Sequence, residues 1–271
     1  MARGVASGSV AGMAAPSGPA DPPVSVPAWE MRPIWRFLLL SVVPFMRLLV
    51  TIRREGTKNI PREGSFVIAP NHTSNIDPIV VGIAVFKGGR TPHFLGKSSL
   101  WKVPGVGALL RATRQIPVER GSNRASDPLG AAGRAAAAGS GIIVYPEGTL
   151  TRDPEIWPMR GKTGAVRIAI GSGVPLIPAA HWGTQSLLPP YARFLRLIPR
   201  RTIVVRFGEP VDLSRFAGKP LDSKALSEAT ELVMTAITGL VEELRGEKAP
   251  QRRWDPAEHN QTEFGRPDRV E

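Results

Sequence analysis

Residues 65–84 of the chain read SFVIAPNHTSNIDPIVVGIA. The first five residues form an apolar run that predicts a short buried strand. Residues 78–86 predict a helix, with Pro78 at its first position, where proline is favoured. His72 and Asp77 therefore stand where a strand ends and a helix begins, a place where α/β sheets often carry their chemistry.

The spacing of His72 and Asp77 predicts a compact loop. On one continuous helix, residues at this separation would not face each other, and Pro78 disfavours helical geometry at Asp77. In a loop, the carboxylate can turn back to Nδ1–H of the imidazole, fix its tautomer and leave Nε2 as a base. On this stretch alone two other interpretations stay open, namely that Asp77 caps the helix and that His72 is an ordinary loop histidine.

A second stretch has the same design. Residues 142–152 read IIVYPEGTLTR, an apolar strand that runs into a polar turn containing a carboxylate, a glycine and an arginine. Strands alternate with helices along the chain. This alternation predicts an α/β fold with a largely parallel, mixed sheet that is flanked by helices on both faces.

Together the two stretches resemble the glycerolipid acyltransferases typified by 1-acylglycerol-3-phosphate acyltransferase. That family carries N-H-x4-D and, further on, [FY]-P-E-G-T-x-[ST]-R, and both motifs stand here without substitution at residues 71–77 and 145–152. The resemblance covers residues 65–182. It implies transfer of an acyl chain from acyl-CoA or acyl-carrier protein to the sn-2 hydroxyl of 1-acylglycerol 3-phosphate, giving phosphatidate. His72 would be the base and Asp77 its orienting partner, with no metal or redox cofactor.

The resemblance also implies a set of substrate-binding residues. Glu147 would bind the glycerol hydroxyl of the acceptor, and Gly148 and Thr149 would belong to the same turn. The acceptor phosphate would be held by cations, since arginine gives bidentate contacts and lysine a point charge. The candidate cations are Arg120, Lys162 and Arg152. Each of the three could instead be a solvated surface charge.

Other chemistries find no support in the sequence. The chain has no cysteine, which excludes disulfides and thiolate nucleophiles. It has no G-x-S-x-G elbow, no complete Walker motif and no His/carboxylate cluster with zinc spacing.

The formal net charge of +12 predicts a surface that attracts anions. The densest basic cluster has apolar residues between its arginines, which suits a membrane surface at least as well as DNA. The cluster consists of Arg193, Arg196, Arg200 and Arg201. We expect the partners to be a lysophospholipid acceptor, an acyl-CoA or acyl-carrier-protein donor and anionic lipids, without nucleic acid. The expected location is the cytoplasmic face of the cell membrane, as a peripheral protein.

Four segments are predicted along the chain. Residues 1–28 and 246–271 are expected to be disordered tails, and residues 51–245 to form the acyltransferase domain. Residues 29–50 are the most hydrophobic segment but lack the roughly 20 apolar residues that a spanning helix needs. We expect an interfacial helix, with Trp29, Trp35, Phe37 and Phe45 entering the headgroup region. The alternative is a helix packed on the core.

Alternatives to the predicted reaction also stay open. The acceptor could be glycerol 3-phosphate, another lysophospholipid or a glycolipid. The motifs relate to the glycerol phosphate and to the acyl-transfer reaction, and they do not distinguish the lipid tail of the acceptor. A basic lipid-binding protein without catalysis is a second class, and a nucleic-acid binder with salt-dependent affinity is a third.

Overall fold

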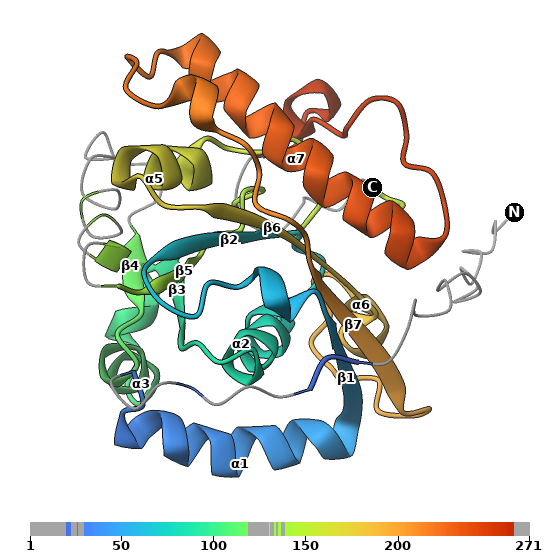
Figure 1. The fold of residues 1–271 in the computed structure, drawn as a ribbon. Coiled ribbons are helices and arrows are strands. Elements are labelled where there is room, and N and C mark those ends of the chain that lie inside the picture. Colours follow the sequence, from blue (N-terminus) through green and yellow to red (C-terminus); the bar gives the residue numbers. More distant parts are fainter. Residues whose placement is uncertain are drawn as a thin grey trace, which may run out of the picture.

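The computed structural model describes residues 20–22, 26, 30–118, 130, 133, 135, 136 and 139–262. Seven of the described segments are strands of one sheet, in the order β1-β7-β6-β2-β5-β3-β4 (Figure 1). The strands are β1 Val50–Glu55, β2 Phe66–Pro70, β3 Pro92–Lys97, β4 Ile116–Val118, β5 Gly141–Ile143, β6 Leu176–Trp182 and β7 Arg201–Phe207. All neighbouring strands pair in parallel except β6 and β7, which are antiparallel. The predicted fold class, a largely parallel mixed sheet, is confirmed.

Helices cover both faces of the sheet, with α1 and α2 on one side and α5 and α7 on the other (Figure 1). The α-helices are α1 Pro33–Leu49, α2 Asp77–Lys87, α3 Val106–Ala112, α5 Gly164–Ser172, α6 Thr184–Leu187 and α7 Ser223–Arg245. Short 3-10 helices are η1 Thr57–Asn59, η2 Ser98–Lys102, η3 Ser214–Phe216 and η4 Pro256–His259.

The central strand β2 is buried on both faces and joins two hydrophobic clusters. Phe66 and Ile68 pack into the cluster that contains α2, whereas Val67 and Ala69 pack into the cluster that contains α5 and α7. This alternation follows from the two-residue period of a strand. Because all four side chains are completely buried, the position of the carboxyl end of β2 is fixed, and so is the start of the loop that follows it.

Helix α1 packs partly on the core, as one alternative for residues 29–50 foresaw, and leaves other apolar side chains exposed. Trp35 and Met46 are buried, and the Trp35 ring lies 6.0 Å from that of Phe86 on α2. The prediction that Trp35 enters a headgroup region is therefore wrong, because its ring packs against the domain. Phe37 and Phe45 are exposed, and Trp29 lies outside the described residues. Within the described ranges, no helix is both long and apolar enough to cross a bilayer.

The structure differs from the sequence prediction at the C-terminal end. Residues 246–262 were expected to be disordered, but Trp254 accepts the backbone N–H of Arg160 at 2.9 Å and stacks on His259 at 3.5 Å. Local polarity predicted disorder here, whereas long-range contacts hold the segment. Residues 263–271 and most of residues 1–28 lie outside the described part, although Asp21 accepts the backbone N–H of Thr57.

Candidate active site

The loop between β2 and α2 is held in the interior by its own polar groups. Asn71, Thr73 and Ser74 are all buried. The amide of Asn71 exchanges two hydrogen bonds with the backbone of His181 at the end of β6, at 3.2 Å and 2.9 Å. Strands β2 and β6 are parallel neighbours, so their carboxyl ends bring these two segments together.

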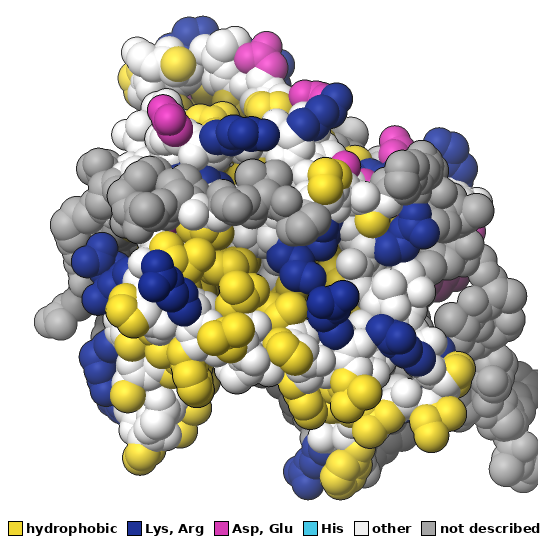
Figure 2. Space-filling model, turned by 60° about the horizontal axis from the view of Figure 1, so that its bottom comes forward, with side chains coloured by type: hydrophobic (Ala, Val, Ile, Leu, Met, Phe, Trp, Pro, Cys, Tyr) yellow, Lys and Arg dark blue, Asp and Glu magenta, His cyan; other side chains and the backbone are white. Residues whose placement is uncertain are grey.

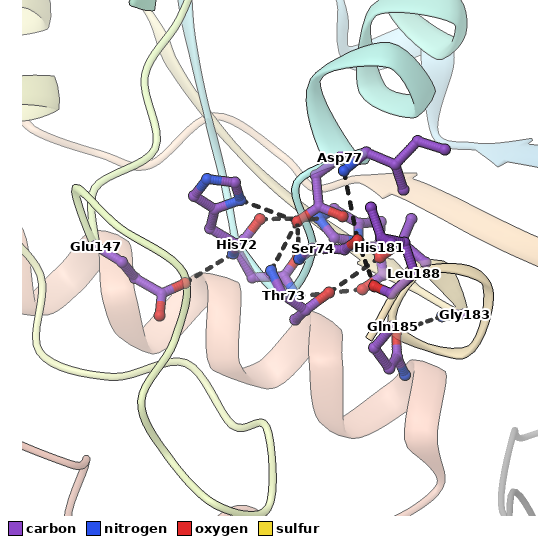
Figure 3. A network of polar contacts seen from close by, with 12 residues as sticks. His72, Thr73, Ser74, Asp77, Glu147, His181, Gly183, Gln185 and Leu188 are labelled. Carbon is purple, nitrogen blue, oxygen red and sulfur yellow. Dashed lines mark hydrogen bonds and ion pairs between the residues drawn. The ribbon is translucent and has the colours of Figure 1, made fainter. Parts of the chain in front are cut away.

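One oxygen of Asp77 is the centre of this loop (Figure 3). Its Oδ2 accepts the backbone N–H groups of Thr73 at 2.7 Å and Ser74 at 2.8 Å. The same oxygen lies 3.0 Å from Nδ1 of His72 and 3.3 Å from Nε2 of His181. The predicted contact between Asp77 and the His72 ring is therefore present. The N–H groups that Asp77 accepts precede α2, so its side chain closes the loop rather than capping the first turn of the helix.

The electrostatics of the site keep Asp77 ionised. Its complete burial would by itself raise the pKa of the carboxyl group. The attraction and hydrogen bond of His181, followed by those of His72, outweigh burial, and the pKa of Asp77 falls well below its ordinary value. An anionic Asp77 beside Nδ1 keeps the proton of His72 on that nitrogen.

His72 presents its other ring nitrogen away from Asp77 (Figure 3). The imidazole stacks on the ring of Tyr145, with centroids 4.1 Å apart and planes tilted by 25°. Tyr145 in turn lies nearly parallel to Phe94 at 6.3 Å. Contacts on Nδ1 and on the ring face fix the imidazole, so Nε2 is placed to exchange a proton with a bound molecule.

Glu147 joins the second motif to the first. Its Oε1 accepts the backbone N–H of His72 at 2.8 Å, and its Oε2 accepts that of Met159 at 3.1 Å. The side chain is completely buried, and burial raises its pKa to about 8, although the N–H groups of Met159 and His72 act in the opposite direction. The backbone N–H of Thr151 donates to the carbonyl of His72 at 2.7 Å. The turn after β5 thus holds both backbone polar groups of His72.

A cavity of about 1390 Å³ opens beside His72. Apolar side chains from α1, α2, β3 and α3 form most of its wall, including Leu39, Ile83, Phe94 and Leu110. Four cations also line it, namely Lys97, Lys162, Arg167 and Arg193. The cavity therefore offers an apolar compartment for a chain and positive charge for an anionic group, next to one histidine.

The chain matches known acyltransferases in sequence and in structure. The sequence model of the Acyltransferase family matches residues 51–182, a range that holds both motifs. Residues 51–182 of the chain thus form a domain of the Acyltransferase family. A curated relative is the 1-acyl-sn-glycerol-3-phosphate acyltransferase of Bacillus subtilis, 26% identical over 78% of this chain and 98% of that protein. The enzyme of that name from Salmonella typhimurium is 28% identical over 77% of this chain and 80% of the relative.

A solved acyltransferase structure supports the same assignment. The crystal structure of the 1-acyl-sn-glycerophosphate (LPA) acyltransferase PlsC from Thermotoga maritima superposes with a TM-score of 0.59 at 27% identity. The match covers 80% of this chain and 81% of that one. The fold of this acyltransferase is thus shared with a protein of the same family.

Some of the predicted substrate-binding residues of the acyltransferase line the cavity, and others do not. Gly148, Thr149 and Lys162 line the cavity together with His72. Gly148 has a φ of 72°, which favours glycine, and a Cβ there would lie 3.2 Å from Cδ of Lys162. The lysine therefore passes directly over this turn.

Three predicted binding residues have a different outcome. Glu147 and Arg152 are buried and are not among the residues that line the cavity. That Glu147 binds the acceptor hydroxyl stays a prediction, and the contacts present give it a role in holding His72. Arg152 as a phosphate ligand also stays a prediction. Arg120 lies outside the described residues.

The sequence interpretation missed several residues of the site. His181 belongs to neither motif, yet it contacts Asp77. No local pattern indicates this contact, because it depends on the pairing of β6 with β2, in which Ala179 pairs with Pro70. Lys97, Arg167 and Arg193 also line the cavity. Lys97 and Arg167 lie outside the two motifs, and the sequence placed Arg193 in the basic cluster rather than in the site.

Proposed function

We propose that the protein transfers an acyl chain from acyl-CoA or acyl-carrier protein to the sn-2 hydroxyl of 1-acylglycerol 3-phosphate, giving phosphatidate for phospholipid synthesis. The observation that carries the proposal is the His72–Asp77 pair, at 3.0 Å, on the wall of a largely apolar cavity that also carries cations. The named activity of the relatives in Bacillus subtilis and Salmonella typhimurium supports the choice of acceptor.

In the proposed reaction His72 acts as the general base. Its Nε2 takes the proton of the acceptor hydroxyl as that oxygen attacks the carbonyl carbon of the thioester. The new C–O bond forms, the C–S bond breaks, and the proton passes from Nε2 to the leaving thiolate. The Asp77 carboxylate stabilises the imidazolium that forms between these two transfers. No covalent acyl-enzyme is required, since the acceptor itself is the nucleophile.

The proposed acceptor is held by charge at one end and apolar contact at the other. Lys162 is the first candidate for its phosphate, because this lysine lines the cavity beside Gly148. Arg167 and Arg193 line the same cavity and would add to the attraction for a dianion. The apolar wall suits an acyl chain, since burial of each methylene contributes about 0.8 kcal/mol.

Release of free thiol from palmitoyl-CoA tests the proposal directly. We expect release that requires 1-acylglycerol 3-phosphate and that falls about 100-fold or more in His72→Ala. The exposed His259 supplies the matched control, because His259→Ala removes an imidazole outside the cavity and is expected to be fully active. Equal release by wild type and His72→Ala would refute the role of His72.

The choice of acceptor and donor separates the remaining alternatives. Release with glycerol 3-phosphate, another lysophospholipid or a glycolipid instead would keep the chemistry and change the substrate. A parallel assay with palmitoyl-acyl-carrier protein identifies the donor. Lack of release with every acceptor and donor, together with retained lipid binding, would favour a non-catalytic lipid-binding protein.

The reaction is further proposed to need no metal or redox cofactor. Proton transfer by His72 and attack by the acceptor hydroxyl leave no step that changes an oxidation state. Activity is therefore expected to survive dialysis against a chelator without loss. A loss that returns with one added divalent cation would overturn this part of the proposal.

We also propose that the protein binds anionic bilayers peripherally through one apolar and basic face, on the cytoplasmic side of the cell membrane. Figure 2 shows apolar side chains gathered on this face with Lys and Arg side chains among them. On α1, Phe37, Leu40, Phe45 and Leu48 are exposed. The arginine-rich segment 193–200 adds exposed Phe194 and Ile198, and Arg200 donates to the carbonyl of Arg47 on α1 at 2.6 Å.

Apolar side chains between arginines favour lipid headgroups over nucleic acid as the partner of this face. Co-sedimentation with vesicles that contain phosphatidylglycerol tests the proposal. Leu40→Ser combined with Ile198→Ser is expected to reduce pelleting strongly, whereas the exposed Lys248→Ser is expected to leave it unchanged. Undiminished pelleting of the double variant, or tight salt-dependent binding of DNA in place of vesicles, would contradict it.

A further inference from the structure

His181 is a second histidine on the carboxylate that orients His72. It stands on β6 and is completely buried. Its Nε2 lies 3.3 Å from Asp77 Oδ2 and 2.9 Å from the carbonyl oxygen of Asn71. Because it is not among the residues that line the cavity, it is not placed to touch a substrate. Its contacts with the site pass through Asp77 and the loop that begins at Asn71.

The surroundings of His181 define its tautomer. Both neighbours of Nε2 are oxygens that can only accept, so this nitrogen carries a proton and donates it. Nδ1 lies 3.2 Å from Oγ1 of Thr184, and that hydroxyl lies 3.0 Å from Oγ1 of Thr73. In the neutral ring Thr184 donates to Nδ1 and accepts from Thr73. The hydroxyl chain therefore fixes the imidazole on the side opposite Asp77.

Four titratable groups face Asp77 among the described residues. His72 and His181 contact its Oδ2. Tyr145 and Glu147, in the turn after β5, interact with Asp77 through charge. The two histidines supply the ring N–H donors to this carboxylate, and only His72 lines the cavity. Of the two rings that donate to Asp77, His72 can therefore reach a substrate and His181 cannot.

We propose that His181 is a positioning residue that holds Asp77 through Nε2–H, so that the carboxylate stays ionised and directed at Nδ1 of His72. The inference rests on the proposed function in taking His72 as the base. A second neutral donor stabilises the carboxylate without adding a positive charge that would compete with the imidazolium formed on His72. The hydrogen bond from His181 to Asp77 therefore stabilises the starting state of the reaction, in which His72 is neutral and Asp77 is an anion.

The sign of the pH effect follows from this arrangement. The His72–Asp77 pair carries one negative charge when His72 is neutral and none after it takes a proton. A hydrogen bond from His181 favours the negative state over the protonated one. Removal of that bond raises the proton affinity of the pair, whichever of the two residues binds the proton. The acid limb of the activity profile is therefore expected to move to higher pH.

The test compares His181→Leu with His181→Gln in a profile of kcat/KM from about pH 5 to about pH 9. We expect the acid limb of His181→Leu to rise by about one pH unit and kcat near neutral pH to fall about 10-fold, with an unchanged KM for the acyl donor. The amide Nε2–H of His181→Gln can replace the ring N–H. The acid limb of this variant is therefore expected to lie close to that of the wild type. His93→Leu, which removes another buried histidine, is expected to leave the limb in place.

A second readout keeps the test independent of turnover. Titration of the His72 Cε1–H resonance by NMR is expected to give a midpoint that is higher in His181→Leu by a similar amount. Where His181→Leu does not fold, His181→Asn replaces it, because its shorter amide cannot reach Asp77. The inference would be overturned if a folded variant kept both the acid limb of the kcat/KM profile and the NMR midpoint of His72. Equal shifts of the acid limb in His181→Leu and His181→Gln would also overturn it. A wild type without acyl transfer would instead refute the proposed function, and the NMR midpoint would still decide the role of His181.

Discussion

Oε1 of Glu147 lies 2.8 Å from the backbone nitrogen of His72, a residue 75 positions earlier in the chain. The two sequence motifs are therefore joined by one buried hydrogen bond, and Oε2 extends the connection to Met159 at 3.1 Å. A buried carboxyl group that accepts two backbone N–H groups can position a base without touching a substrate. This geometry separates a positioning role for Glu147 from a direct role in binding the acceptor.

Kinetics of Glu147→Gln distinguish the two roles. The amide has a single acceptor oxygen, so one of the two N–H groups loses its partner and the backbone at His72 shifts. We expect kcat to fall about 10-fold, with little change in the KM for 1-acylglycerol 3-phosphate. Glu209→Gln, at a largely exposed carboxylate, serves as the control. A large rise in the acceptor KM at unchanged kcat would show instead that Glu147 binds the acceptor.

The raised pKa of Glu147 also predicts how stability depends on pH. The carboxyl titrates near 8 in the folded chain and near its ordinary value of about 4.3 when unfolded. Between these values the folded state holds the extra proton, so the contribution of Glu147 to stability decreases as pH rises. Urea unfolding of wild type and Glu147→Gln is therefore expected to show a stability difference that moves in favour of the variant from about pH 5 to about pH 8. A difference that stays constant over this range would contradict the assignment.

Lys162 is predicted to bind the acceptor phosphate. In Lys162→Met the aliphatic stem beside Gly148 is largely kept and the charge is lost. We expect the KM for 1-acylglycerol 3-phosphate to rise about 10-fold, because a charge-assisted contact is removed, while kcat at saturation changes little. Lys58→Met removes an exposed charge and is expected to have no effect. Equal acceptor KM values in wild type and Lys162→Met would refute this role.

The sequence predicted the parts of the site that depend on local geometry. The contact between His72 and Asp77 could be predicted from their spacing and from the proline that follows Asp77. Both features favour a loop in which the carboxylate turns back to the imidazole. Gly148 was placed in the site by the family resemblance, and its φ of 72° is one that favours glycine. The strands on either side were predicted from apolar runs, which are typical of a parallel sheet buried on both faces.

Contacts between distant segments could not be predicted in the same way. His181 reaches Asp77 only because β6 lies beside β2, and the strand order of a sheet is not written in any local pattern. Trp35 is apolar on a helix with two apolar faces, so its burial against Phe86 depends on how α1 docks. The order of residues 246–262 likewise depends on partners such as Arg160, far away in the sequence.

A buried ion pair between Glu30 and Arg90 leads to the last prediction. The two side chains are almost completely buried, and Glu30 also accepts the N–H and hydroxyl of Thr91. Arg90 donates to three backbone carbonyls and lies over the ring of Phe66 at 4.7 Å. Since Glu30 precedes α1, the pair fixes the start of this helix to the domain.

Glu30→Ala leaves the Arg90 charge buried without its carboxylate. The free energy of unfolding, measured in urea, is expected to fall by about 3–5 kcal/mol, as for other buried pairs that lose one partner. Glu258→Ala breaks a pair with Arg252 in which both side chains are exposed, and it is expected to cost about 0–1 kcal/mol. Similar losses in the two variants would show that the Glu30–Arg90 pair does not anchor α1, and that other contacts, such as the packing of Trp35 and Met46, hold this helix on the domain.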